Sequence, residues 1–196
     1  MKNLDSNLNK EKIIQDLQKQ DCFSLGDFAI KIHYDESPDS PRNWDNLGKM
    51  GCFHRKYDLG DKHNFANYSE FADFLFKNKP ELIILPIYIY DHSGLTIATV
   101  PFHCPWDSEQ IGYIYVKKNQ ENLSEEQIKQ ILINEVATYD QYLTGEVFAF
   151  EILKNDQFVD GVCGYYDKMN CINEAINSFE GVFIKKPPQT NQLSLF

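Results

Sequence analysis

Four of the five histidines and two of the five cysteines are the side chains whose types best suit metal chemistry. They are His54, His63, His92, His103, Cys52 and Cys104, which include the close pairs Cys52-x-His54 and His103-Cys104. Imidazole and thiolate groups bind zinc in tetrahedral sets. The ligand spacings of zinc ribbons and zinc fingers are absent, so these residues are candidates for a zinc site without forming a known motif.

A second candidate metal site consists of carboxylates in a long polar segment, residues 34–64. Its acidic side chains include Asp35, Glu36, Asp39 and Asp45. Carboxylate oxygens are the ligands that hard divalent cations prefer, but the spacing of a calcium-binding loop is missing. The alternative is a functional loop that hydrogen bonds and Trp44 hold in place.

Cys104 could act as a nucleophile if His92 served as its base and Asp91 oriented the histidine. Asp91 and His92 are sequence neighbours near a tight turn, however, which tends to direct their side chains to different sides. The sequence also lacks a phosphate-binding loop, a glycine-rich dinucleotide fingerprint and a serine elbow. We therefore assign no catalytic residue and no cofactor.

The elements that would position these residues follow from hydrophobic periodicity and capping signals. Helices are expected near 9–17, 67–79, 124–143 and 169–179, and strands near 28–32, 82–90, 95–100, 111–116, 147–153 and 157–166. Two hairpins result, one over 82–100 with its turn at Asp91 to Gly94, and one across 154–156. We predict an α+β fold: a single acidic domain over residues 1–180, with an antiparallel sheet and three to four helices, and a flexible extended tail over residues 181–196.

The formal net charge of −10 is concentrated in one stretch of the chain. Residues 120–180 contain twelve acidic and three basic side chains, a net charge of −9. We expect an acidic face that includes Glu125, Glu126, Glu135, Asp140 and Glu146. Such a face repels a phosphate backbone, so no direct binding to nucleic acid is expected. It would suit a basic nucleic-acid-binding protein, although acidic surfaces often serve only solubility.

Three features of the sequence indicate the cellular compartment. The five cysteines form no Cys-x-x-Cys pair, the N-terminal residues lack an apolar targeting region, and no run of about 18 apolar residues could cross a membrane. We therefore expect a soluble protein of the reducing cytoplasm that does not associate with membranes.

The tail contains a short apolar sequence, Gln192-Leu193-Ser194-Leu195-Phe196, after a proline-containing spacer over residues 185–191. In all five positions it resembles the pentapeptide by which bacterial polymerases, mismatch-repair proteins and initiators dock onto the replication sliding clamp. The resemblance implies that Leu195 and Phe196 fill an apolar pocket of the clamp and that Gln192 hydrogen-bonds beside it. The alternative is that the tail folds back onto the protein's own core.

Four stretches of the body are similar to uncharacterised proteins of bacteriophages and other mobile elements, over roughly residues 27–166. They are Ser40-Pro41-Arg42-x-Trp44-Asp45-Asn46-Leu47-Gly48, Tyr90-Asp91-His92-Ser93-Gly94, Cys104-Pro105-Trp106-Asp107-Ser108 and Tyr139-Asp140-x-Tyr142-Leu143-x-Gly145-Glu146. The resemblance implies a phage or mobile-element setting in a host bacterial cell, where small acidic proteins often neutralise host systems. It assigns no catalytic residue.

These observations lead to two hypotheses. The first is a non-enzymatic interaction protein that docks on the host sliding clamp through its tail. Its acidic body would modulate or inhibit a nucleic-acid-processing or defence system, for example as a counter-defence inhibitor. The alternative is a clamp-recruited, metal-dependent hydrolase that processes DNA, with the carboxylates of residues 35–61 as metal ligands.

Overall fold

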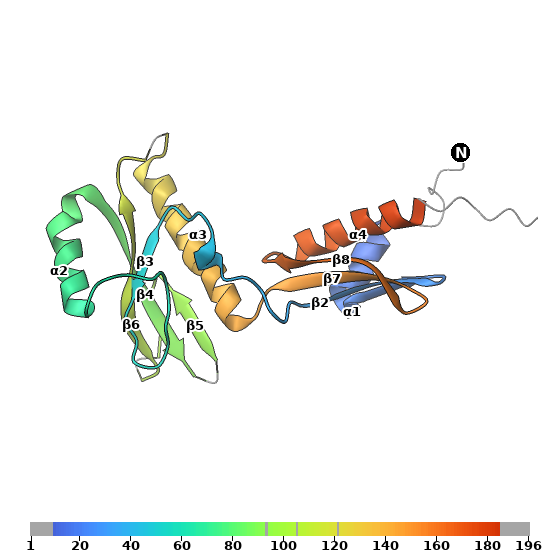
Figure 1. Ribbon diagram of the computed structural model, residues 1–196, viewed down its shortest axis with the longest axis horizontal. Helices are drawn as coiled ribbons and strands as arrows, with labels where there is room; N and C mark the ends of the chain where they lie inside the picture. The colour runs from blue at the N-terminus through green and yellow to red at the C-terminus, as the bar shows by residue number, and fades with distance from the viewer. Residues whose placement is uncertain (1–9, 93, 105, 121, 185–196) are drawn as a thin grey trace, which may run out of the picture. The chain divides into compact units, whose positions relative to one another are not determined.

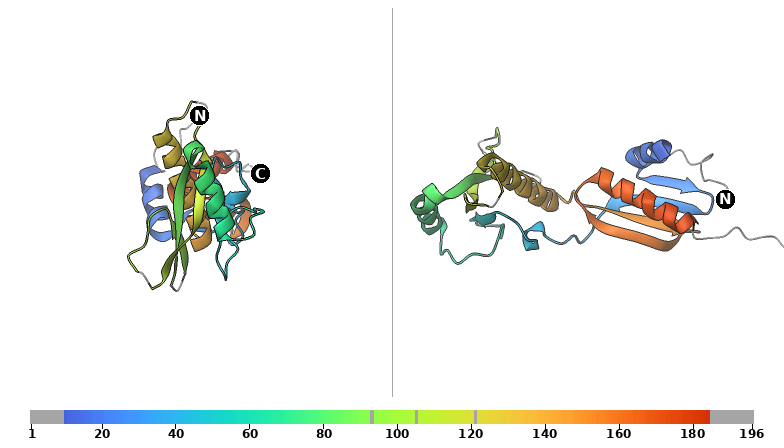
Figure 2. Two further views of the ribbon diagram at one scale, coloured as in Figure 1. Left: turned by 90° about the vertical axis from the view of Figure 1, so that its left-hand side faces the viewer. Right: turned by 90° about the horizontal axis from the view of Figure 1, so that it is seen from above.

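The computed structural model describes residues 10–184 except 93, 105 and 121, and the chain divides into two compact units. Residues 1–38 and 147–196 form one unit, which we call the split unit because it is built from two separate segments. Residues 39–146 form the other, which we call the inserted unit. Figures 1 and 2 show the helices and strands of both units.

The split unit is a four-stranded antiparallel sheet with two helices. Its elements are α1 (Lys10–Gln20), β1 (Cys22–Leu25), β2 (Phe28–Tyr34), β7 (Phe148–Lys154), β8 (Gln157–Tyr165) and α4 (Lys168–Ile184). The strand order is β1-β2-β7-β8. The first hairpin therefore pairs with the last one, although the whole inserted unit separates them in the sequence. Alternate residues of β2, Phe28, Ile30 and Ile32, are buried in one core with residues of α1 and α4. Both helices therefore cover the same face of the sheet.

The inserted unit is a second four-stranded antiparallel sheet, with a helix on each face (Figure 1). Its elements are the 3-10 turns η1 (Pro41–Asn43) and η2 (Lys79–Glu81), the strands β3 (Lys49–Cys52), β4 (Leu82–Asp91), β5 (Leu95–Ala98) and β6 (Ser108–Lys117), and the helices α2 (Tyr68–Asn78) and α3 (Glu125–Thr144). The strand order is β3-β6-β4-β5. In β4, Ile83 packs in the core beneath α3, whereas Leu82 packs in the core beneath α2. Burial on both faces explains why this strand reads as a continuous apolar run.

The ends of the helices follow the predicted capping signals. Asn67 accepts a hydrogen bond from the backbone N–H of Glu70 at the start of α2. Ser124 and Gln127 form a reciprocal capping box at the start of α3, and Gly145 ends that helix in the left-handed conformation, with φ of 76°.

The α+β class, the antiparallel pairing and the hairpin over residues 82–100 are confirmed. The strands form two sheets, however, where the sequence analysis expected one. Two short strands, β1 and β3, were not predicted, and β3 lies inside the segment 34–64 that was interpreted as a loop.

Helix α4 continues to Ile184, past the predicted helix end at 179 and past the predicted boundary of the tail at 181. The reason is that Val182 and Phe183 extend its apolar stripe, and the ring of Phe183 lies 5.6 Å from that of Phe179. Residues 185–196, with the spacer and the pentapeptide, lie outside the described residues. In the described part of the chain, no helix is both long and apolar enough to cross a membrane.

Candidate functional site

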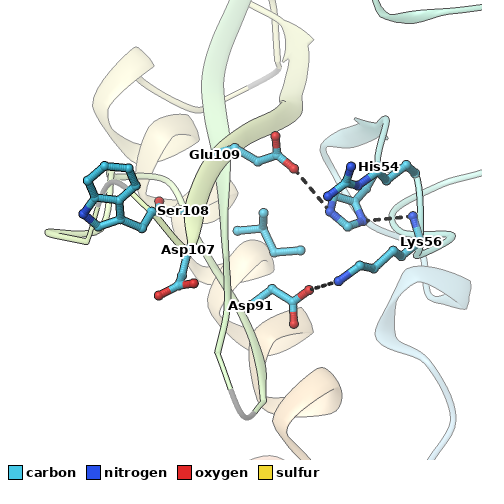
Figure 3. A pocket seen from close by; sticks show the side chains of 9 residues that line it. His54, Lys56, Asp91, Asp107, Ser108 and Glu109 are labelled. Atoms are coloured by element: carbon cyan, nitrogen blue, oxygen red, sulfur yellow. Dashed lines mark hydrogen bonds and ion pairs between the residues drawn. The ribbon is translucent and has the colours of Figure 1, made fainter.

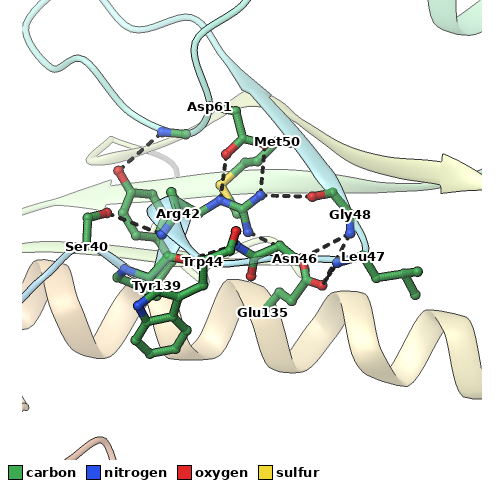
Figure 4. A network of polar contacts seen from close by, with 12 residues as sticks. Ser40, Arg42, Trp44, Asn46, Leu47, Gly48, Met50, Asp61, Glu135 and Tyr139 are labelled. Carbon is green, nitrogen blue, oxygen red and sulfur yellow. Dashed lines mark hydrogen bonds and ion pairs between the residues drawn. The ribbon is translucent and has the colours of Figure 1, made fainter. Parts of the chain in front are cut away.

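A buried arginine organises the segment between β2 and α2. The side chain of Arg42 is 4% exposed and lies between Asp61 and Glu135 (Figure 4). Its Nε and Nη2 atoms donate to the two carboxylate oxygens of Asp61 at 2.9 and 2.8 Å, and Nη1 donates to Glu135 at 3.3 Å. Nη2 also donates to the carbonyl oxygen of Gly48 at 2.9 Å. This bidentate geometry makes the guanidinium a rigid cross-link between distant parts of the inserted unit.

The two carboxylates extend the cross-link to the backbone. Glu135 accepts hydrogen bonds from the N–H groups of Leu47, at 2.8 Å, and Gly48, while Asp61 accepts one from Met50 at 2.8 Å. Burial disfavours the charged guanidinium, but the hydrogen bonds and charges of Asp61 and Glu135 outweigh burial and raise the pKa of Arg42.

These contacts correct the interpretation of residues 34–64. Arg42 holds this segment, whereas we expected Trp44 to do so, and the side chain of Trp44 is about half exposed. The segment lies close to the core at Gly48. A Cβ atom there would lie 2.5 Å from the side chain of Leu132 and 2.8 Å from that of Ile114, so a larger residue would force these side chains to shift. The stretch Ser40 to Gly48 therefore has a structural role in the inserted unit.

The second and third stretches, around Asp91 and Asp107, meet at a half-open cavity of about 500 Å³ (Figure 3). Its walls come from the loop after β3, the end of β4 and the beginning of β6. The lining residues are His54, Arg55, Lys56, Ile89, Asp91, Trp106, Asp107, Ser108 and Glu109. Of these, Trp106 is 91% exposed.

His54 is the most buried titratable side chain of this cavity, with 6% exposure. Its Nδ1 atom accepts a hydrogen bond from the backbone N–H of Lys56 at 3.3 Å. That bond places the proton of the neutral ring on Nε2, which lies 3.3 Å from Glu109. The ring also stacks on Tyr57, with 5.0 Å between the centroids. Because both nitrogens are engaged, His54 is not placed to accept a proton from a substrate in this arrangement.

Asp91 is paired on the other side of the cavity. It accepts hydrogen bonds from Lys56 Nζ at 3.1 Å and from the hydroxyl of Tyr57 at 3.2 Å. The hydrogen bond from Lys56 is the largest cause that lowers the pKa of the Asp91 carboxyl, and the charge of Lys56 adds to it. The acid is therefore a structural partner of Lys56.

The proposed nucleophilic set of Cys104, His92 and Asp91 is not formed. His92 Nδ1 instead lies 3.4 Å from the carboxylate of Asp107, and the Cys104 thiol lies 3.5 Å from the same oxygen. The acid thus lies between the thiol and the imidazole, where a catalytic arrangement would need the imidazole between them. The sequence analysis expected Asp91 and His92 to point to different sides, and the two side chains contact different partners, Lys56 and Asp107.

The candidate metal ligands are also dispersed. Burial raises the pKa of the Cys52 thiol to about 12, which disfavours the thiolate that zinc requires. His63 lies with its Nε2 atom 3.4 Å from the carbonyl oxygen of Cys52. Asp35 accepts a hydrogen bond from the Ser37 backbone in the split unit, whereas Asp39 and Asp45 belong to the inserted unit. Within residues 10–184, except 93, 105 and 121, no three His, Cys, Asp or Glu side chains are grouped so that they could hold a metal ion. His103 therefore belongs to no such group either.

The predicted acidic face is divided in two ways. Residues 120–146, with a net charge of −5, belong to the inserted unit, and residues 147–180, with a net charge of −4, belong to the split unit. Glu125, Glu126 and Glu146 are exposed. Glu135 is instead bound to Arg42, and Asp140 accepts hydrogen bonds from the hydroxyl of Thr96 at 2.6 Å and the backbone of Ile97 at 2.7 Å. Glu135 and Asp140 are therefore engaged in contacts within the inserted unit.

The pentapeptide Gln192 to Phe196 lies outside the described residues, so its contacts are not part of the structural description. Among the described residues, neither the cavity nor the Arg42 network presents a metal-ligand set, and the Cys104 thiol near the cavity contacts the Asp107 carboxylate rather than an imidazole. Comparison of the chain with models of protein families, with curated proteins and with solved structures finds no match.

Proposed function

We propose that this chain is a non-enzymatic interaction protein that docks on the DNA sliding clamp of a bacterial host through Gln192 to Phe196. The observation that carries the proposal is the pentapeptide itself, which resembles the clamp-binding motif at every position. Its Leu195 and Phe196 would enter an apolar pocket of the clamp, and Gln192 would hydrogen-bond beside it.

The described residues of the split unit form a core of their own. It is made by side chains between Ile13 and Phe183, and twelve of them are buried. Helix α4, which immediately precedes the spacer, is anchored through Ile172, Ile176 and Phe179.

The remaining part of the proposal concerns the body, which would modulate or inhibit a nucleic-acid-processing or defence system of the host. Net charges of −5 and −4 over the stretches 120–146 and 147–180 favour a basic partner over nucleic acid. The alternative, a metal-dependent hydrolase that acts on DNA, has no metal-ligand set among the described residues. Nuclease activity in magnesium or manganese that disappears on Asp45→Ala would favour that alternative.

Calorimetry with purified clamp tests the docking. We expect micromolar binding, about −8 kcal/mol, for the whole chain and for a synthetic peptide of residues 185–196. Burial of Leu195 and Phe196 would contribute roughly 1.5–3 kcal/mol each. Their double replacement by alanine should therefore raise the Kd at least about 100-fold, to above about 0.1 mM.

Two controls define the outcome. Phe76→Ala removes another side chain that is 81% exposed, in the inserted unit, and should leave clamp binding unchanged. The melting temperature of the Leu195→Ala/Phe196→Ala variant should equal that of the wild type. If the peptide does not bind, or if the double variant melts at a lower temperature, the pentapeptide belongs to the protein's own core and the proposal is wrong.

A further inference from the structure

Strand β8 is a long edge strand. It ends the order β1-β2-β7-β8 and contains nine residues, whereas β1, β3 and β5, the other three edges of the two described sheets, contain four residues each. An edge strand presents unpaired N–H and C=O groups to any strand that approaches it. Short edges limit such pairing, and β8 lacks this protection.

Apolar side chains are clustered on this strand. Phe158, Val159 and Val162 are 65%, 42% and 47% exposed, and they lie within five residues of one another. A Cβ atom at Gly161 would lie 3.0 Å from the ring of Phe158, so the ring lies along the strand. Single exposed apolar residues are normal on a protein surface, but a cluster on a sheet edge indicates an interaction site.

Charge on β8 favours a second copy of this chain as the partner. Asp160 is the only Asp, Glu, Lys or Arg of the strand, and its carboxylate accepts hydrogen bonds from the hydroxyl of Ser178 in α4 and from the backbone of Gly161. The lysines and prolines that protect many natural edges are absent from the strand. Because the chain carries a net charge of −10, two copies repel each other, and β8 adds to this repulsion only the charge of Asp160, whose carboxylate is engaged within its own copy.

We propose that β8 pairs antiparallel with β8 of a second copy, which gives a symmetric dimer whose two sheets are continuous through this edge. The pairing is self-complementary, as a two-fold axis requires. Register shifts against β7 fall near Val159 and between Val162 and Tyr165, so the regular segment is Asp160 to Val162. The contact is therefore centred on these three residues and on packing of Phe158 and Val159.

The size of the contact sets its strength. A nine-residue strand is about 30 Å long, and one strand pair with a few side chains buries less than the roughly 1,200–2,000 Å² of standard interfaces. The dimer should therefore be weak and depend on protein concentration in the micromolar range. If the proposed clamp docking holds, a dimer would offer two pentapeptides to a ring of identical protomers, and avidity would tighten that binding.

Analytical ultracentrifugation of the protein alone tests the dimer independently of the clamp. The variant is Val162→Asp. In an antiparallel pair centred on Asp160 to Val162, residue 162 of one copy lies opposite Asp160 of the other, so the change sets two negative charges against each other. Its matched control is Val100→Asp, the same change at a 64%-exposed valine of the inserted unit. We expect the wild type and Val100→Asp to dimerise with the same Kd and Val162→Asp to dimerise at least tenfold more weakly.

A wild type that stays monomeric at hundreds of micromolar would overturn the inference, as would equal effects of the two aspartate variants. If Val162→Asp fails to fold, Val159→Asp, at the register shift next to Asp160, supplies the second variant and should weaken the dimer in the same way. The peptide of residues 185–196 lacks β8, so its calorimetry with the clamp reports the docking alone. Failure of the dimer and failure of the docking are therefore distinguishable.

Discussion

Replacement of Arg42 by methionine should be among the most destabilising single changes in the inserted unit. Methionine keeps the apolar stem but removes all four hydrogen bonds that the guanidinium donates to Asp61, Glu135 and Gly48. The side chains of Asp61 and Glu135 are 18% and 11% exposed, so their charges would remain in a poorly solvated site without a counter-ion.

The expected loss of stability follows from the two carboxylates that are left without a counter-ion. Removal of one partner from a buried ion pair typically costs about 3–5 kcal/mol. Domains of this size are stable by roughly 5–15 kcal/mol, so a large part of the stability would be lost. The matched control is Lys118→Met, which breaks an exposed ion pair with Glu125, 3.7 Å apart, and should cost at most about 1 kcal/mol.

Urea unfolding followed by tryptophan fluorescence provides the assay. Both tryptophans, Trp44 and Trp106, belong to the inserted unit, so the signal reports that unit. A triple variant, Arg42→Met with Asp61→Asn and Glu135→Gln, removes the stranded charges and keeps amide oxygens as acceptors for the backbone. It should recover more than half of the lost stability. A cost below about 1 kcal/mol for Arg42→Met, equal to the exposed control, would refute the role of the network as the anchor of this segment.

Two further predictions concern titratable groups. The folded-state pKa of Asp91 lies below its ordinary value of 3.8, so its pairing with Lys56 stabilises the fold fully above that value and ceases to do so as the pH falls through the folded-state pKa. The stability difference between the wild type and Asp91→Asn, from urea titrations at a series of pH values, should be constant near neutral pH and shrink below about pH 4; a constant difference down to pH 2 would contradict the assignment. The raised pKa of Cys52 predicts that its thiol stays protonated at pH 8, and mass spectrometry after a short iodoacetamide pulse should show label on the exposed Cys163 and none on Cys52 until the protein unfolds. Equal labelling of the two thiols would show that Cys52 is not buried in the core.

The sequence predicted the elements whose signals are local. Helix α3 follows from its capping box, its apolar stripe and Gly145, all within one continuous stretch. The hairpin of β4 and β5 follows from a continuous apolar run, a turn and a second β-prone run. In both cases the residues that determine the element are sequence neighbours, so no knowledge of the rest of the chain is needed.

The sequence also contained the pentapeptide, which no tertiary contact is needed to identify. Its clamp docking remains a prediction, because residues 185–196 lie outside the described part of the chain. Helix α4 continues four residues into the predicted tail, since its apolar stripe includes Val182 and Phe183 and the helix ends at Ile184.

Only the tertiary structure decided which strands share a sheet and which polar groups meet. Strand β2 pairs with β7, although the whole inserted unit separates them in the sequence. The strands β1 and β3 contain four residues each and are too short to show a periodicity of their own. Arg42 binds an acid 19 residues away and another 93 residues away, and Asp107, rather than the adjacent Asp91, reaches His92. The sequence did not predict these pairings because they depend on how complete elements pack. No local pattern of residue types specifies the partner of a strand edge or of a buried charge.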